Sequence, residues 1–292
     1  MKQRLITAAV LLCILVPVLI FSDTLFFPVI AAVFCFIAVW EMQHCLGCHK
    51  KYAVSIPSYL MAIGLPLGLF LVGGLDGIRV RPFPVYNRAL YLLAFAAAFA
   101  VYMFYLFAAA VFCRRALSFS EIASSYMTTF YITLAFTAIP FIRYGAHGEY
   151  YFLLCFLGAW VTDSFAYFVG YLFGRHKLIP EISPKKTVEG SIGGSVGCVL
   201  AFLLFGFFAG KETGQTPNYA VLAGLGFLVS ILAQIGDLIA SLIKREHEIK
   251  DYGKIFPGHG GVMDRFDSVI ATTPLLLIVC TLDSLLSYNL LL

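Results

Sequence analysis

Glycines, carboxylates and cations are interspersed between residues 244 and 267 of the sequence. Gly258, Gly260 and Gly261 lack a Cβ, so the backbone there can adopt positive φ and bring its N–H groups against phosphate oxygens. The cations that could neutralise the same oxygens, as point charges or bidentate forks, are Lys244, Arg245, Lys250 and Arg265. This combination predicts a polyphosphate site.

Two carboxylates in the same segment favour a magnesium ion. Asp264 and Asp267 are three residues apart, and they share a face if a helix has begun by that point. Mg²⁺ in proteins commonly uses one or two carboxylates together with substrate phosphates. The alternative is a basic loop that only contacts anionic lipid headgroups. That alternative explains the cations, but it explains neither the glycines nor the paired aspartates.

Two further aspartates lie inside strongly apolar stretches. An ionised Asp at the centre of a bilayer costs about 2.5–3.5 kcal/mol on insertion scales, so such residues usually face a polar cavity. Asp237 lies one helical turn before Ser241 and two before Lys244, which places it beside the glycine-rich segment and predicts a metal ligand. Asp163 is the second, and pairing of helices through a polar contact is the alternative role for it.

The composition indicates the elements that must position these residues. Of the 292 residues 61% are hydrophobic and 12% charged, with a mean hydropathy of +0.90, which excludes an ordinary soluble domain. Runs of about 17 to 25 apolar residues can cross the hydrocarbon core as helices. We therefore predict an all-α integral membrane protein with nine transmembrane helices: Leu5–Phe21, Leu25–Met42, Val54–Gly73, Ala89–Phe112, Thr128–Phe141, Tyr150–Phe173, Ser191–Ala209, Tyr219–Ile239 and Phe266–Leu286.

The distribution of Lys and Arg predicts the orientation of these spans. With a cytoplasmic N-terminus, 15 of the 20 cations fall on the cytoplasmic side, as the positive-inside rule requires. Two long polar loops, residues 174–190 and 244–267, then face the cytoplasm. We predict one polytopic membrane domain, 1–292, with N-terminal spans in 1–150 and a catalytic half in 151–292.

A C-x-x-C-H sequence at Cys45, Cys48 and His49 has the spacing that attaches c-type haem. Lys50 and Lys51 follow directly and place this segment in a predicted cytoplasmic loop. We interpret it as a polar turn between two spans.

The C-terminal half resembles the phosphatidate cytidylyltransferases, also called CDP-diacylglycerol synthases. Their pattern S-x-x-K-R-x4-K-D, a spacer, and P-x-H-G-G-x-x-D-R-x-D is matched at every fixed position from Ser241 to Asp267. The family segments W-x-x-D-[TS]-x-A-Y and S-P-K-K-T-x-E-G are matched at residues 160–167 and 183–190. Three positions carry residues that differ from those usual in the family: Phe165 stands where Gly is common, Val188 where Trp is common, and Ala240 where an acid often precedes the Ser.

The resemblance implies transfer of a cytidylyl group from CTP to phosphatidic acid, with release of diphosphate. It implies Mg²⁺, as one ion or more, held by Asp237 and Asp264 with Asp267, Asp251 and Asp163 as further ligands. It implies that Lys244, Arg265 and His259 act in catalysis beside those aspartates. The residues that it implies in substrate binding are Ser183, Lys185, Lys186, Thr187, Ser241, Arg245, Lys250, Gly258, Gly260 and Gly261.

The expected partners are CTP, phosphatidic acid, membrane lipid and a second copy of the chain, with no nucleic acid. The expected location is the bacterial cytoplasmic (inner) membrane, with the active site facing the cytoplasm. A CTP-dependent polyprenol or lipid kinase, which would attack the γ-phosphorus and release CDP, is the first alternative. A membrane transporter is the second, although its site would lie at the midplane between repeated halves and no repeat is evident.

Overall fold

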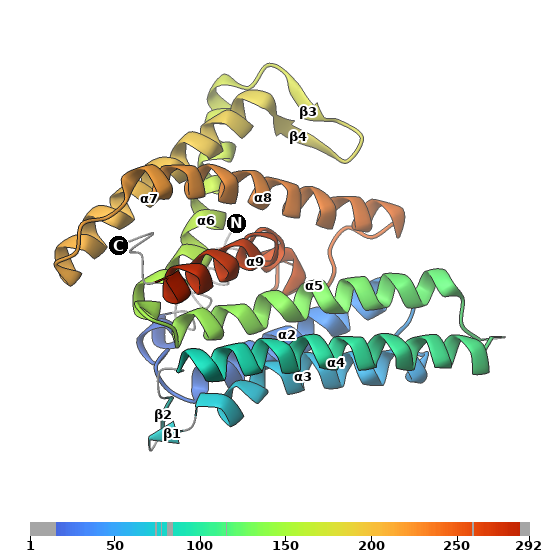
Figure 1. Cartoon of the computed structure of the whole chain (residues 1–292). Coiled ribbons are helices and arrows are strands. Elements are labelled where there is room, and N and C mark those ends of the chain that lie inside the picture. The colour runs from blue at the N-terminus through green and yellow to red at the C-terminus, as the bar shows by residue number, and fades with distance from the viewer. Residues whose placement is uncertain are drawn as a thin grey trace. The chain divides into compact units, whose positions relative to one another are not determined.

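The computed structural model describes residues 16–73, 75–76, 78–80, 84–114, 116–258 and 260–286. Eight long helices lie within these residues: α2 Phe26–Cys45, α3 Tyr52–Gly73, α4 Val85–Phe112, α5 Phe119–Arg143, α6 Gly148–Phe173, α7 Val188–Thr213, α8 Tyr219–Glu246 and α9 Met263–Leu286 (Figure 1). Two antiparallel hairpins complete the described elements: β1 Leu75–Asp76 with β2 Arg79–Val80, and β3 Lys177–Ile179 with β4 Ser183–Thr187.

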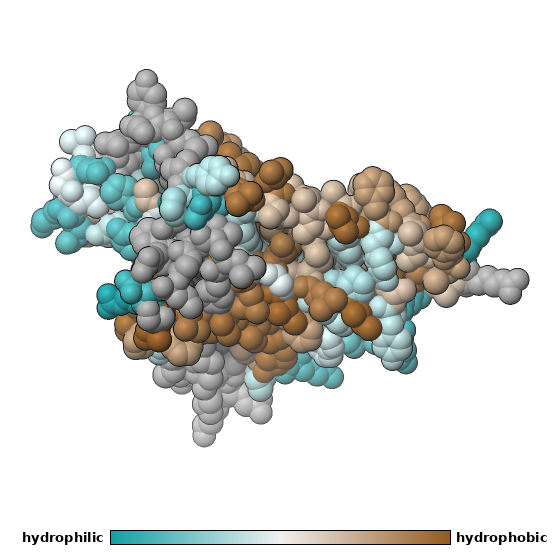
Figure 2. Space-filling view, turned by 60° about the horizontal axis from the view of Figure 1, so that its bottom comes forward, coloured by the Kyte–Doolittle hydropathy of each residue, from teal (hydrophilic) through white to brown (hydrophobic). Residues whose placement is uncertain are grey.

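All eight of these helices contain a stretch long and apolar enough to cross a membrane. Many large apolar side chains remain exposed, among them Val101, Phe104 and Phe208. Figure 2 shows large areas of hydrophobic side chains on the surface, which in water would be unfavourable and in a bilayer face lipid. The all-α membrane fold is therefore confirmed. The predicted first span, Leu5–Phe21, lies mostly outside the described residues.

The helices extend beyond the predicted apolar runs. α5 begins at Phe119 instead of Thr128, because Ser118 and Glu121 form a capping box at its start. The Ser118 side chain accepts the Glu121 N–H at 3.2 Å, and the Glu121 carboxylate accepts the Ser118 N–H at 3.0 Å. α8 likewise continues past Ile239 to Glu246 through the polar residues of the family pattern. Hydropathy finds the part of a helix inside the membrane and misses its polar ends.

The chain forms two compact units from interleaved segments. The first comprises Met1–Tyr144 and His247–Arg265, and the second Gly145–Glu246 and Phe266–Leu292. The glycine-rich segment therefore packs with the N-terminal helices, whereas we expected it to belong with the C-terminal half. The prediction of one membrane domain stays a prediction.

The first unit packs α2, α3, α4 and α5 side by side (Figure 1). Its interior includes a polar contact around the buried Gln43, whose Nε2 lies 2.7 Å from Ser125 Oγ and 3.2 Å from Ser58 Oγ. Polar contacts of this kind between transmembrane helices typically contribute about 0.6–2 kcal/mol.

In the second unit α7 packs closely against α6 and α8. Small residues on α7 make the approach to α6 possible: a Cβ added at Gly193 would overlap Val169, and one added at Gly197 would overlap the ring of Phe165. The β3–β4 hairpin joins α6 to α7 and extends beyond their ends (Figure 1). Lys177 and Lys185 of the hairpin are exposed, whereas Lys186 is half-buried.

Candidate active site

Three aspartates from three helices of the second unit form an acidic cluster. They are Asp163 on α6, Asp237 on α8 and Asp267 on α9. The carboxylates of Asp163 and Asp237 both act electrostatically on that of Asp267. Ser268 Oγ, next along α9, donates to Asp163 Oδ2 at 3.1 Å. The structure therefore brings together three of the five predicted metal ligands.

Lysines bring positive charge to the same cluster. Lys186, on β4, places its Nζ 2.7 Å from Asp237 Oδ2 and 3.2 Å from the Gln234 carbonyl oxygen on α8. Lys244, two turns after Asp237 on α8, interacts with the Asp267 carboxylate. A group of negative charges next to cations of this kind suits a ligand that carries both a metal ion and phosphates.

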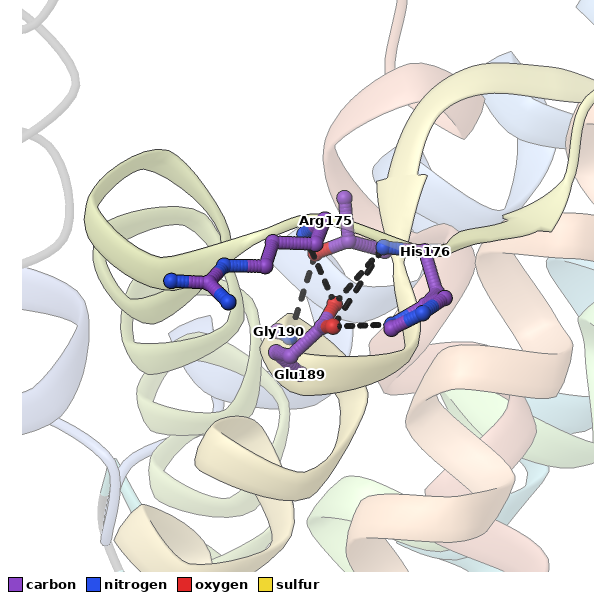
Figure 3. Close-up of polar contacts among 5 residues, drawn as sticks. Arg175, His176, Glu189 and Gly190 are labelled. Carbon is purple, nitrogen blue, oxygen red and sulfur yellow. Dashed lines mark hydrogen bonds and ion pairs between the residues drawn. The ribbon is translucent and has the colours of Figure 1, made fainter.

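The hairpin that carries Lys186 is fixed at its base by Glu189, in the first turn of α7 (Figure 3). The Glu189 carboxylate accepts the backbone N–H groups of Arg175 at 3.1 Å and of His176 at 3.2 Å. His176 Nδ1 lies 2.6 Å from the same carboxylate. Thr187 caps α7, because its Oγ1 accepts the Gly190 N–H at 3.1 Å. The predicted substrate-binding residue Thr187 thus has a structural hydrogen bond.

A pocket of about 730 Å³ lies in the first unit, in the segment between α8 and α9. It is lined by three cations, one carboxylate and five glycine, proline or aromatic residues: Lys250, Lys254, Arg265, Asp251, Gly253, Phe256, Pro257, Gly258 and Gly260. The lining carries more positive than negative charge, as a phosphate site requires. Five of these residues, Lys250, Asp251, Gly258, Gly260 and Arg265, were predicted from the sequence.

Positive φ was expected at all three of Gly258, Gly260 and Gly261, and the structure has it at two of them. Gly258 and Gly260 have φ of 78° and 82°, whereas Gly261 has an ordinary negative φ. A Cβ added at Gly260 would lie 2.6 Å from Asp264 Oδ2. That same oxygen accepts the backbone N–H groups of Tyr252 at 2.8 Å and of Gly261 at 2.9 Å. Asp264 is buried and connects the two ends of the loop.

A cytidylyltransferase family model matches residues 2–283. The chain belongs to the cytidylyltransferase family. A phosphatidate cytidylyltransferase of Staphylococcus aureus (strain COL) is 33% identical over 279 residues, which cover 94% of this chain and 97% of that protein. Proteins of the same name from Staphylococcus haemolyticus (strain JCSC1435) and Staphylococcus saprophyticus are 32% and 33% identical, with the same coverage.

The remaining predicted residues of this cytidylyltransferase differ in their exposure. Lys185 and Arg245 are exposed, while Ser183 and Ser241 are half-buried on β4 and α8. His259 lies outside the described residues. Asp251 lines the pocket of the first unit, and Asp264 holds backbone amides there. The predicted metal ligands therefore divide between the two units.

The donor set is compatible with magnesium. Within the described ranges no three His, Cys, Asp or Glu side chains converge as a complete metal site. Mg²⁺ does not need one, because it usually takes one or two carboxylates and completes its octahedron with water and substrate phosphates. Asp237 and Asp267 can supply those carboxylates, since they are neighbours on α8 and α9 and carry hard oxygen donors.

Sequence reasoning missed Glu41 and Lys254 and gave Glu189 no role. Glu41, on α2, is fully buried and accepts the backbone N–H groups of Val262 at 3.1 Å and of Met263 at 2.9 Å. A carboxylate inside a predicted span was its only signal in the sequence. Lys254 lines the pocket, but it lies in the spacer of the family pattern, which contains no fixed position.

The Cys45–His49 segment forms a turn between α2 and α3, with Gly47 at a φ of 68°. Cys48 is fully buried, and burial raises the pKa of its thiol. A buried, protonated thiol is a poor partner for haem attachment or metal binding. This geometry agrees with the interpretation as a turn.

Proposed function

We propose that this chain is a multi-pass membrane phosphatidate cytidylyltransferase. It transfers the cytidylyl group of CTP to phosphatidic acid, releases diphosphate and leaves CDP-diacylglycerol in the membrane. The observation that carries the proposal is the similarity to three relatives of that name over 94% of the chain. The two polar sites give this activity the groups it needs, namely cations for two polyanionic substrates and carboxylates for a metal.

The reaction requires little acid–base chemistry of the protein. A phosphate oxygen of phosphatidic acid attacks the α-phosphorus of CTP, and the bond between the α-phosphorus and the bridging oxygen breaks as diphosphate leaves with its electron pair. The nucleophile is already an anion, so no base needs to remove a proton. What the protein must supply is positioning and charge stabilisation.

We assign the pocket of the first unit to the phosphates of CTP. Lys250, Lys254 and Arg265 neutralise them, and the backbone N–H groups of the loop can donate to their oxygens. We assign Lys186 and Lys244 in the second unit to stabilising the negative charge that develops on the phosphate oxygens during the transfer. His259 remains a proposed donor to the leaving diphosphate.

Asp237 and Asp267, with Asp163 beside them, would hold Mg²⁺. When bound, Mg²⁺ supplies Lewis-acid stabilisation of the phosphate oxygens. Lys186 pairs with Asp237 and offsets part of the acidic charge. We further propose that both sites open to the cytoplasm, where CTP is found, that the membrane is the bacterial cytoplasmic (inner) membrane, and that two copies of the chain associate.

The test uses purified full-length protein in detergent with phosphatidic acid, CTP and Mg²⁺. Diphosphate and CDP-lipid are quantified in the same reaction, with chelation by EDTA and the variant Asp237→Asn as controls. We expect equal amounts of both products, loss of turnover with EDTA, recovery with added Mg²⁺, and at least a hundredfold loss in the variant. Release of CDP without diphosphate, from added prenols, would instead identify a lipid kinase, and no turnover with either lipid would favour the transporter alternative.

A further inference from the structure

Glu41 has no direct part in the proposed reaction, yet its exposed fraction is 0%, lower than that of Arg88, Asp264 or Asp283. Its two oxygens accept the N–H groups of Val262 at 3.1 Å and Met263 at 2.9 Å, from the last loop residue and the first residue of α9. The first N–H groups of a helix have no partner within the helix. Glu41 supplies that partner from α2, across 221 residues of sequence.

Two glycines of the loop are close to the same carboxylate. A Cβ added at Gly253 or at Gly261 would overlap Glu41 Oε1 and the carboxyl carbon. Neither glycine has positive φ, so backbone conformation does not require glycine at these two positions. The requirement comes from the close approach of Glu41. Both ends of the loop 253–261 therefore rest on one side chain of the N-terminal half.

The same loop forms most of the pocket wall. Gly253, Lys254, Phe256, Pro257, Gly258 and Gly260 all line the pocket. Between its ends the loop is closed by a bridge in which the Phe256 N–H donates to the Gly260 carbonyl at 2.9 Å. A substitution of Glu41 therefore alters the two ends of the loop that forms the pocket wall, and through them the shape of the pocket.

We propose that Glu41 is a positioning residue for the nucleotide: from α2 it fixes the shape of the loop 253–261 and thereby the affinity for CTP. The assignment of the pocket to CTP rests on the function proposed above. Under this proposal the N-terminal helices do more than anchor the enzyme in the membrane, because one of them sets the geometry of the substrate pocket.

The first test compares Glu41→Gln and Glu41→Ala with the wild-type enzyme. Glutamine keeps one acceptor oxygen but turns an NH₂ group toward the second amide, and alanine leaves both amides without an acceptor. We expect the KM for CTP to rise roughly tenfold or more in Glu41→Ala and less in Glu41→Gln, since hydrogen bonds to a charged group are among the stronger ones. Loss of fold alone would lower the apparent kcat and leave this KM unchanged, and that result would overturn the proposal.

A second readout does not depend on activity. Hydrogen–deuterium exchange of the purified protein should become faster in residues 252–263 of both variants, while exchange in α3, α4 and α5 stays unchanged. Equal exchange in 252–263 for wild type and variants would contradict the proposed contact. If the wild-type enzyme released no diphosphate from CTP, the proposed function would fail, and the exchange experiment would still decide whether Glu41 holds the loop.

A third comparison tests the contact between Glu41 and Gly261. Gly261→Ala alone should raise the KM for CTP, because the new methyl group displaces the carboxylate. In the double variant Glu41→Ala, Gly261→Ala the methyl group finds room, so the double variant should be no worse than Glu41→Ala. Gly64→Ala is the matched control, since Gly64 lies on α3 of the same unit with open space around its Cα. If the increases in KM caused by the two single substitutions multiply in the double variant, the two residues act independently, and the contact is refuted.

Discussion

Asp264 and Asp267 lie three residues apart in the first two turns of α9, yet their carboxylates have different partners. The family pattern singles out both Asp264 and Asp267, and α9 begins at Met263, before both of them, although the predicted span began only at Phe266. Their surroundings differ. Asp264 accepts two backbone N–H groups of the loop, whereas Asp267 interacts with the charges of Asp163 and Asp237. Spacing predicts that residues share a face, but their partners come from segments distant in the sequence.

We expect the variant Lys186→Ala to lower kcat/KM for phosphatidic acid and CTP by roughly a hundredfold, because it loses one charged group that stabilises the transition state. Lys186 lies within ion-pair distance of Asp237, so its removal takes a positive charge away from the acidic cluster. Steady-state kinetics in detergent measures the effect. Lys211→Ala, an exposed lysine at the end of α7, is the control. Wild-type kinetics in Lys186→Ala would contradict the assignment.

The helices themselves were the most predictable part of the fold. All eight described helices overlap predicted spans, since about 20 apolar residues leave few alternatives in a membrane. Their packing was not predictable from hydropathy. Phe165, which stands where the family commonly has glycine, packs against Gly197 of α7, so a large residue on α6 is matched by a small one opposite.

This pairing predicts that Gly197→Ala destabilises the second unit. Its new Cβ would overlap the Phe165 ring, and overpacking of a core typically costs about 1–3 kcal/mol. Gly224→Ala on α8 is the matched control, because nothing lies within 4 Å of a Cβ added there. That control should be neutral or stabilise the helix by about 0.5–1 kcal/mol. Thermal unfolding of both variants in detergent measures the difference, and equal midpoints would argue against close packing at Gly197.

On the scale of the whole chain, the sequence suggested an N-terminal half for anchoring and a C-terminal half for catalysis. The contact between Glu41 and Met263 connects the two halves, and no local sequence pattern predicts it. The loop 247–265 is polar, so hydropathy assigns it only to a side of the membrane and not to a packing partner. The two sets of site residues accordingly belong to two units, and the first unit combines the N-terminal helices with the C-terminal segment 247–265.

The predicted orientation can be measured by labelling cysteines with a membrane-impermeant maleimide. Cys113 is exposed in the connection between α4 and α5, on the side predicted to be cytoplasmic. As the only cysteine of a variant, it should react in inverted vesicles and stay unlabelled in right-side-out vesicles. A second variant, with Glu212→Cys as the only cysteine, places the thiol at the end of α7 and should show the opposite pattern. Labelling of Cys113 from the outside would reverse the orientation.

The 221 residues between Glu41 and Val262 also set an order of events during synthesis of the chain. At about 5–20 residues per second, the ribosome needs roughly ten to forty seconds to make the partners of a carboxylate that has already emerged. During that interval only water and lipid headgroups can solvate Glu41, which favours keeping the end of α2 at the membrane surface. A nascent chain that stops before residue 262 can insert its first helices but lacks the two amides that bind Glu41 beside the pocket. With the pocket assigned to CTP as proposed above, the ability to bind CTP arises late, shortly before α9 leaves the ribosome.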